Sequence, residues 1–122
     1  MLAKPLVEHD SSAWDKDSAL TRLMNNDSLL KQICGIFINN SVVQMGLLSE
    51  CIDNKDIECV QAKAHSLKGS TGDLGAKELN RLFAAMEESA KKQDIETASS
   101  LFSDVQSQYP QFIELITAYV KS

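Results

Sequence analysis

Residues 27–54 read DSLLKQICGIFINNSVVQMGLLSECIDN, and this stretch decides the fold class. Its apolar residues recur at three- and four-residue steps, the spacing of one face of an α-helix. They are Leu29, Leu30, Ile33, Cys34, Phe37, Ile38, Met45, Leu48 and Ile52. No segment alternates apolar and polar residues cleanly over six positions, as a half-buried strand would, and the chain has only two prolines. We therefore expect an all-α protein.

Capping residues outward from this stretch predict where the helices begin and end. Asn26 or Asp27 can cap the first long helix, and the turn DNKD at 53–56 ends with Asp56, which can cap the next. The sequence GDLG at 72–75 ends that second helix. Residues 76–93 form a third amphipathic helix, and Asp94 caps a last one, which we expect Pro110 to kink or restart.

The order of these helices predicts a topology. Short connections make sequential helices pack antiparallel, so we expect an up-down-up-down four-helix bundle. A short extra N-terminal helix precedes it, and its Trp14, Leu20 and Leu23 would cover one end of the bundle. We divide the chain into a flexible lead or linker over residues 1–12 and one bundle domain over 13–122.

Composition limits the function classes. The 122 residues carry a net charge of −5 and show no basic stripe, which disfavours nucleic-acid binding. Residues 61–82 alone carry +2, which favours an anionic group or an acidic partner there, although ordinary scatter of surface charge explains it equally well. No apolar run reaches the roughly 20 residues of a membrane span, and residues 1–12 lack a signal-peptide core, so we expect a cytoplasmic domain without membrane contact.

The chain has three cysteines, Cys34, Cys51 and Cys59, and no C-x-x-C pair. With only two histidines besides, a structural zinc site is poorly supported. We expect the three cysteines to be buried reduced thiols, and we expect no metal or cofactor bound by this chain.

One helix face is built for more than stability. Residues 64–75 read AHSLKGSTGDLG, and each glycine in a helix interior costs about 1 kcal/mol relative to alanine. On a helix, Gly69 lies about 40° and Gly72 about 20° from His65, with Lys68 about 60° to one side. Leu67, Thr71 and Leu74 fall on the opposite face with Val60, so we expect them in the core and His65 in solvent.

This geometry favours a phosphoryl-accepting nucleophile at His65. Neutral imidazole is available near pH 7 and carries a lone pair, so it needs no second base. A bare face at Gly69 and Gly72 would let a large partner approach the ring, and Lys68 could hold an anion there. A simple solvated histidine is the alternative reading of the same residues.

The stretch AHSLKGSTGDLGA at 64–76 resembles the signature of histidine-containing phosphotransfer (HPt) domains. That signature runs His-x-hydrophobic-Lys-Gly, a small polar stretch, then hydrophobic-Gly, and it is matched by His65, Leu67, Lys68, Gly69, Leu74 and Gly75. Residues 13–37 resemble the lead-in of such domains at the C-terminus of hybrid sensor histidine kinases, and residues 79–94 resemble the helix after the signature.

The resemblance implies a phosphorelay intermediate of a two-component system. His65 would accept a phosphoryl group from an aspartate of a response-regulator receiver and pass it to another receiver, without autokinase activity or nucleotide binding. Lys68 would support the phosphoryl oxygens, Ser66, Gly69 and Gly72 would contact the receiver, and Gly75 would shape the helix end. The receiver, which can be that of its own parent kinase, would supply Mg²⁺ to a monomeric domain.

Other readings stay open. Some HPt relatives carry glutamine 22 residues after the histidine, where this chain has Glu87, an acid that would repel a phosphoryl group and is therefore a doubtful site residue. Alternatives are a bundle that only binds a signalling partner, a helical adaptor, and a hydrolase or transferase with an acid or base beside His65. The resemblance of residues 13–37 favours a kinase tail over a free protein and leaves both open.

Overall fold

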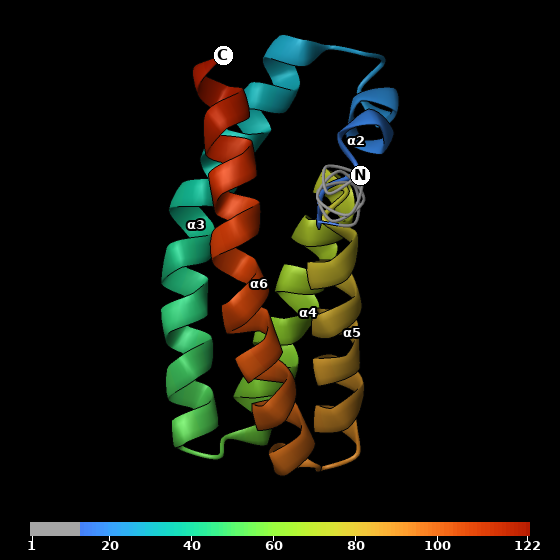
Figure 1. The fold of residues 1–122 in the computed structure, drawn as a ribbon. Coiled ribbons are helices and arrows are strands. Elements are labelled where there is room, and N and C mark those ends of the chain that lie inside the picture. Colours follow the sequence, from blue (N-terminus) through green and yellow to red (C-terminus); the bar gives the residue numbers. More distant parts are fainter. Residues whose placement is uncertain (1–12) are drawn as a thin grey trace, which may run out of the picture.

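The computed structural model describes residues 13–122, which form one short helix and four long ones (Figure 1). These are α2 (Lys16–Arg22), α3 (Asp27–Asp53), α4 (Ile57–Leu74), α5 (Lys77–Lys91) and α6 (Ile95–Lys121). The four long helices run alternately up and down side by side, with the α3–α4 and α5–α6 turns at one end (Figure 1). The predicted all-α bundle with a short first helix is confirmed. The lead predicted for residues 1–12 lies outside the described residues.

Side-chain caps fix the helix starts where the sequence placed them. The side chains of Asn26, Asp56 and Asp94 each accept a hydrogen bond from the backbone N–H three residues on. Asn26, and not Asp27, is thus the cap of α3. Gly75 ends α4 in the left-handed conformation, with φ 78°, which glycine adopts without steric cost.

The core lies along the axis of the bundle. Helix α3 packs against α4 and α6, and α5 packs against the same two, so the helices form a four-sided ring. Each long helix contributes the apolar face predicted from its periodicity, except that Leu29 of α3 is 37% exposed. The largest fully buried side chains are Leu30, Leu48, Val60, Leu74, Leu79, Leu82, Phe83, Met86, Val105, Phe112 and Ile116, together with Thr71.

Helix α2 is tied to the C-terminal end of α4. The indole Nε1 of Trp14 donates to the carbonyl of Leu74 at 2.8 Å, and Arg22 Nη1 donates to the carbonyl of Gly72 at 2.6 Å. The Trp14 bond satisfies a carbonyl that the helix end leaves without a partner, and the Gly72 carbonyl accepts the Arg22 bond in addition to one from the Gly75 N–H. Three side chains of this segment pack against the core, as predicted: Trp14, Leu20 and Leu23.

Of the kink or restart expected at Pro110, the restart is wrong. Helix α6 continues through Pro110 from Ile95 to Lys121. Proline removes the N–H that would bond to the carbonyl of Gln106. Both residues are exposed, so water can take the place of that donor and the helix need not stop.

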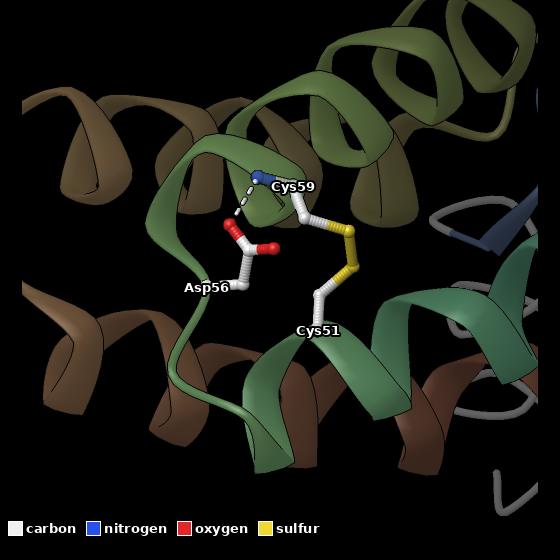
Figure 2. Close-up of a disulfide and its surroundings, with 3 residues drawn as sticks. All are labelled: Cys51, Asp56 and Cys59. Atoms are coloured by element: carbon white, nitrogen blue, oxygen red, sulfur yellow. Dashed lines mark hydrogen bonds between the residues drawn. A yellow bond between two sulfur atoms is a disulfide. The ribbon is translucent and has the colours of Figure 1, made fainter.

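The expectation of three reduced thiols is wrong for two of the cysteines. Cys51 near the end of α3 and Cys59 in the first turn of α4 form a disulfide beside the Asp56 cap (Figure 2). Their Cα atoms lie 5.7 Å apart because the short turn folds α4 back along α3. Cys34 is a buried free thiol, as predicted, and burial raises its pKa to about 11.

Candidate phosphotransfer site

Helix α4 holds His65 on the outside of the bundle. Its inward face buries Val60, Leu67 and Thr71, and the His65 side chain on the other face is 68% exposed. The outward position of His65, predicted from the helical wheel, is confirmed. The ring lies over an open hollow between α4 and α5, lined by Glu58, Gln61, Ala62, His65, Glu87 and Lys91.

A carboxylate of α5 binds two candidate site residues of α4. Glu87 Oε2 lies 2.8 Å from His65 Nδ1, and Glu87 Oε1 lies 2.7 Å from Lys68 Nζ. Lys91, one turn further along α5, brings its Nζ to 3.8 Å from Glu87 Oε2. The Glu87 side chain is only 8% exposed, so the exposed ring is anchored on a buried acid.

Glu87 is charged at neutral pH. The hydrogen bond from Lys68 is the main cause that lowers the pKa of the Glu87 carboxyl, and the bond from His65 adds to it. Desolvation acts in the opposite direction and is outweighed. The site is therefore a carboxylate between two cationic side chains, with an imidazole at its outer edge.

This carboxylate orients the imidazole. A charged Glu87 can only accept, so its partner on the ring is a protonated Nδ1. In the neutral ring, the lone pair then lies on Nε2. Because Nδ1 is engaged, Nε2 is the ring nitrogen available for attack.

The surface beside the ring is bare at Gly69 and covered at Gly72. A Cβ built on Gly69 meets nothing within 4 Å, whereas one on Gly72 would lie 3.0 Å from Asn80 Nδ2 of α5. Asn80 is fixed there by donating to the carbonyl of Lys68 at 2.7 Å. The expected bare face is thus present at Gly69 and absent at Gly72.

The two other residues singled out from the sequence take different places. Ser66 is exposed beside His65. Gly75 is buried, and a Cβ there would collide with the carbonyl oxygen of Asp15 as well as strain the positive φ. The position of Gly75 is therefore that of a structural residue.

A groove between α3 and α4 adjoins the bare face. Its walls combine apolar and small polar side chains: Ile33, Ile36, Phe37, Asn40, Ser41 and Gln44 on α3, and Ser66, Leu67, Ser70, Asp73 and Leu74 on α4. Ile36 is 59% exposed at its rim, and further along α3 Val43 and Leu47 are also exposed. Exposed apolar side chains on one helix face are typical of a surface that binds another protein.

Comparison with known proteins identifies the family. The model of the Hpt domain family matches residues 32–119, which is more than half of the chain. The chain belongs to the Hpt domain family. Its role is that of a histidine phosphotransfer domain in a phosphorelay, and Hpt domains work with the receiver domains of response regulators.

A solved structure shares the fold of this Hpt domain. Histidine-containing phosphotransfer protein B (HptB) from Pseudomonas aeruginosa PAO1 superposes with a TM-score of 0.83 at 18% identity. The match covers 89% of this chain and 95% of the HptB chain. No curated protein matches the sequence significantly. In residues 13–122 no helix is both long and apolar enough to cross a membrane.

The contacts of Glu87 with His65 and Lys68 are the feature of the site that the sequence did not predict. In the sequence, this position stands out only because some HPt relatives carry glutamine there, 22 residues after the histidine. An acid at that place is expected to repel a phosphoryl group. The sequence does hold a further signal, since Glu87 follows Phe83 by four residues and so borders the apolar face of α5. An acid at such a position is buried only when it has partners, and His65 and Lys68 are those partners.

Proposed function

We propose that His65 is the phosphoacceptor of this Hpt domain and that its Nε2 is the attacking atom. The observation that carries the proposal is the 2.8 Å contact between His65 Nδ1 and the buried Glu87 carboxylate. This contact leaves Nε2 free on an exposed ring. In-line phosphoryl transfer requires positioning and charge compensation more than covalent help from the fold that carries the acceptor, and a fixed exposed ring meets that need.

Lys68 is the proposed support for the phosphoryl oxygens. Its ammonium group forms an ion pair with Glu87 beside the ring, and the Lys68 side chain is 36% exposed. A flexible lysine can move its charge from the carboxylate to an arriving phosphoryl group without any change in the backbone. The receiver, which contributes the aspartate, is also the proposed source of Mg²⁺.

The proposed receiver contact runs from the ring across α4 to α3. Gly69 and Ser66 are exposed next to His65, and the α3–α4 groove with Ile36 and Asn40 continues the same surface. A receiver seated on His65 would therefore place an apolar element in this groove. Gly72 lies under Asn80 and contributes less to the contact than the sequence suggested.

The test is phosphoryl transfer from a phosphorylated receiver. Wild type should acquire acid-labile, base-stable label, whereas His65→Gln should acquire none and stay folded, because the ring is exposed. His9→Gln is the matched control, since His9 is the second of the two histidines in the chain. Label on His65→Gln, or no label on wild type with a panel of receivers, contradicts the proposal.

A hydrolase or transferase built on His65 is the one alternative with an observation in its favour. It requires an acid or base within reach of the ring, and Glu87 fills that position. That carboxylate binds Nδ1 and Lys68, so it orients the ring and leaves any proton exchange with a substrate to Nε2. Release of inorganic phosphate from phosphoester substrates by the isolated domain would favour the enzyme.

The wider context is also a proposal. We propose that the domain is monomeric, cytoplasmic and without autokinase activity, and that it belongs to the C-terminal part of a hybrid sensor kinase. Residues 13–37, which suggested that context, are integrated here, because Trp14 and Arg22 hold the end of α4. An immunoblot of native cells should show a protein far larger than 13.4 kDa, and a band at that mass would indicate a free protein.

A further inference from the structure

The charge of Glu87 has a consequence for the phosphorylated state. Its carboxylate is 8% exposed and touches Nδ1 of a ring whose other nitrogen faces solvent. The charged side chains around the ring are Glu58 and Lys68 from α4 and Glu87 and Lys91 from α5. Among them, Glu87 is the one in hydrogen-bond contact with the ring.

The proton on Nδ1 decides how easily the phosphoryl group leaves. When Nε2 attacks the receiver's acyl phosphate, the P–O bond to the aspartate breaks and a P–Nε2 bond forms. The aspartate leaves as a carboxylate, and the ring becomes a phospho-imidazolium that still carries its Nδ1 proton. In the return step the P–N bond breaks and its electron pair stays on Nε2, so neutral imidazole departs.

Loss of that proton would trap the phosphoryl group. From a ring without Nδ1–H, the leaving group would be an imidazolide anion, which is a far poorer leaving group. A carboxylate that accepts the Nδ1–H bond stabilises the protonated ring, because hydrogen bonds between charged partners are about twice as strong as neutral ones. Glutamine at the same place would accept the same bond without the charge.

A second effect of the Glu87 carboxylate is electrostatic repulsion of the phosphoryl group. A phosphoryl group on Nε2 brings two negative charges close to the buried Glu87 carboxylate, and like charges in a poorly hydrated place raise the free energy. Lys68 and Lys91 compensate part of this repulsion. The remainder favours departure of the phosphoryl group.

We propose that Glu87 is a positioning residue that keeps Nδ1 of phosphorylated His65 protonated and so makes the phosphohistidine a fast phosphoryl donor to the receiver aspartate. The inference rests on the proposed function of His65. Considered from the sequence alone, repulsion between Glu87 and a phosphoryl group is a reason against a role for Glu87 in the site. In the structure this repulsion and the Nδ1 bond together define the role.

The test compares Glu87→Gln with wild type and with Glu88→Gln. Glu88 is the neighbouring acid of α5, 61% exposed, so its variant makes the same change in net charge away from the ring. Each protein is phosphorylated by a receiver, isolated and mixed with fresh unphosphorylated receiver, and the rate at which label passes from histidine to aspartate is measured at pH 8. Glu87→Gln should transfer its phosphoryl group about tenfold more slowly than wild type, the effect of exchanging a charged acceptor of the Nδ1–H bond for a neutral one.

Two readouts separate this role from a merely structural one. Hydrolysis of the isolated phosphohistidine should accelerate at a lower pH in Glu87→Gln than in wild type, because the ring loses its proton more readily. In wild type, ¹⁵N resonances of the phosphorylated ring should show Nδ1 protonated at pH 8, a measurement that needs no variant. If circular dichroism shows that Glu87→Gln is unfolded, the ¹⁵N measurement on wild type alone tests the inference.

Three results would overturn the inference. They are an unchanged transfer rate in folded Glu87→Gln, a faster transfer, and a deprotonated Nδ1 in phosphorylated wild type. Failure of wild type to accept any label would instead refute the phosphoacceptor role of His65, so the two failures are distinguishable.

Discussion

Substitution of Gly69 should raise stability and weaken receiver binding at the same time. Gly69 lies one turn after His65 in the middle of α4, and an added Cβ there meets nothing within 4 Å. A side chain on a helix leans towards the N-terminus, so a residue at 69 would cover the turn that carries His65. The same methyl group that helps the helix therefore occupies the approach to the ring.

The structure sets the expected magnitudes. Glycine to alanine in an open helix interior gains about 1 kcal/mol of unfolding free energy, which for a domain of this size raises Tm by about 4 °C. An extra methyl pressed into a close contact costs about 1–3 kcal/mol. Gly69→Ala should therefore weaken receiver binding about tenfold, and Gly69→Leu should abolish it while the domain stays folded.

The assay pairs thermal unfolding with titration of an unphosphorylated receiver by calorimetry. Gly46→Ala is the matched control, because Gly46 is exposed in α3 and also has nothing within 4 Å of an added Cβ. It should gain similar stability and bind the receiver as wild type does. Receiver affinity unaltered in Gly69→Leu would refute the docking geometry, and a lower Tm in Gly69→Ala would refute the open environment of Gly69.

Three further predictions concern the ion pair and the disulfide. Lys68→Ala should slow phosphoryl transfer more than it weakens receiver binding, and equal losses in rate and affinity would contradict this. The same variant should lose about 1 kcal/mol of unfolding free energy in urea, because Glu87 loses its closest partner. The pKa of Glu87 is lowered in the fold, so its stabilisation is present above its usual value of 4.5 and is lost as pH falls. Unfolding followed from pH 7 to pH 3 should accordingly show a smaller acid loss in Glu87→Gln, and identical slopes would count against it. Reduction of the Cys51–Cys59 disulfide should cost about 2.5 kcal/mol of stability, the loop-closure term for so short a loop. The reduced domain should still accept label, and loss of transfer on reduction would show that the bond supports the site.

Much of the fold could be predicted from the sequence because it depends on interactions between residues that are close together in the chain. The period of apolar residues in 27–54 defines a helix whatever the rest of the chain does, and Asn26, Asp56 and Asp94 cap their helices through bonds to residues three positions away. The outward position of His65 follows from the same periodicity. Pro110 is the exception, since whether a proline ends a helix depends on whether the freed carbonyl reaches water.

Contacts between helices could not be read in this way. The Glu87–His65 and Glu87–Lys68 contacts depend on the register of α5 against α4, and that register is set by packing of the whole core. The position of Asn80 also depends on this register. Asn80 covers Gly72, although the helical periodicity of α4 alone predicts a bare surface at that glycine.

By itself, the sequence determined the helices, their caps and the face on which His65 stands, because hydrogen bonds and periodicity within one helix involve residues at most four positions apart. Only the tertiary structure decided the partner of the ring, since side chains 22 residues apart meet only after α4 and α5 have packed together. It likewise decided the bond between Cys51 and Cys59, because the turn between α3 and α4 brings them within reach.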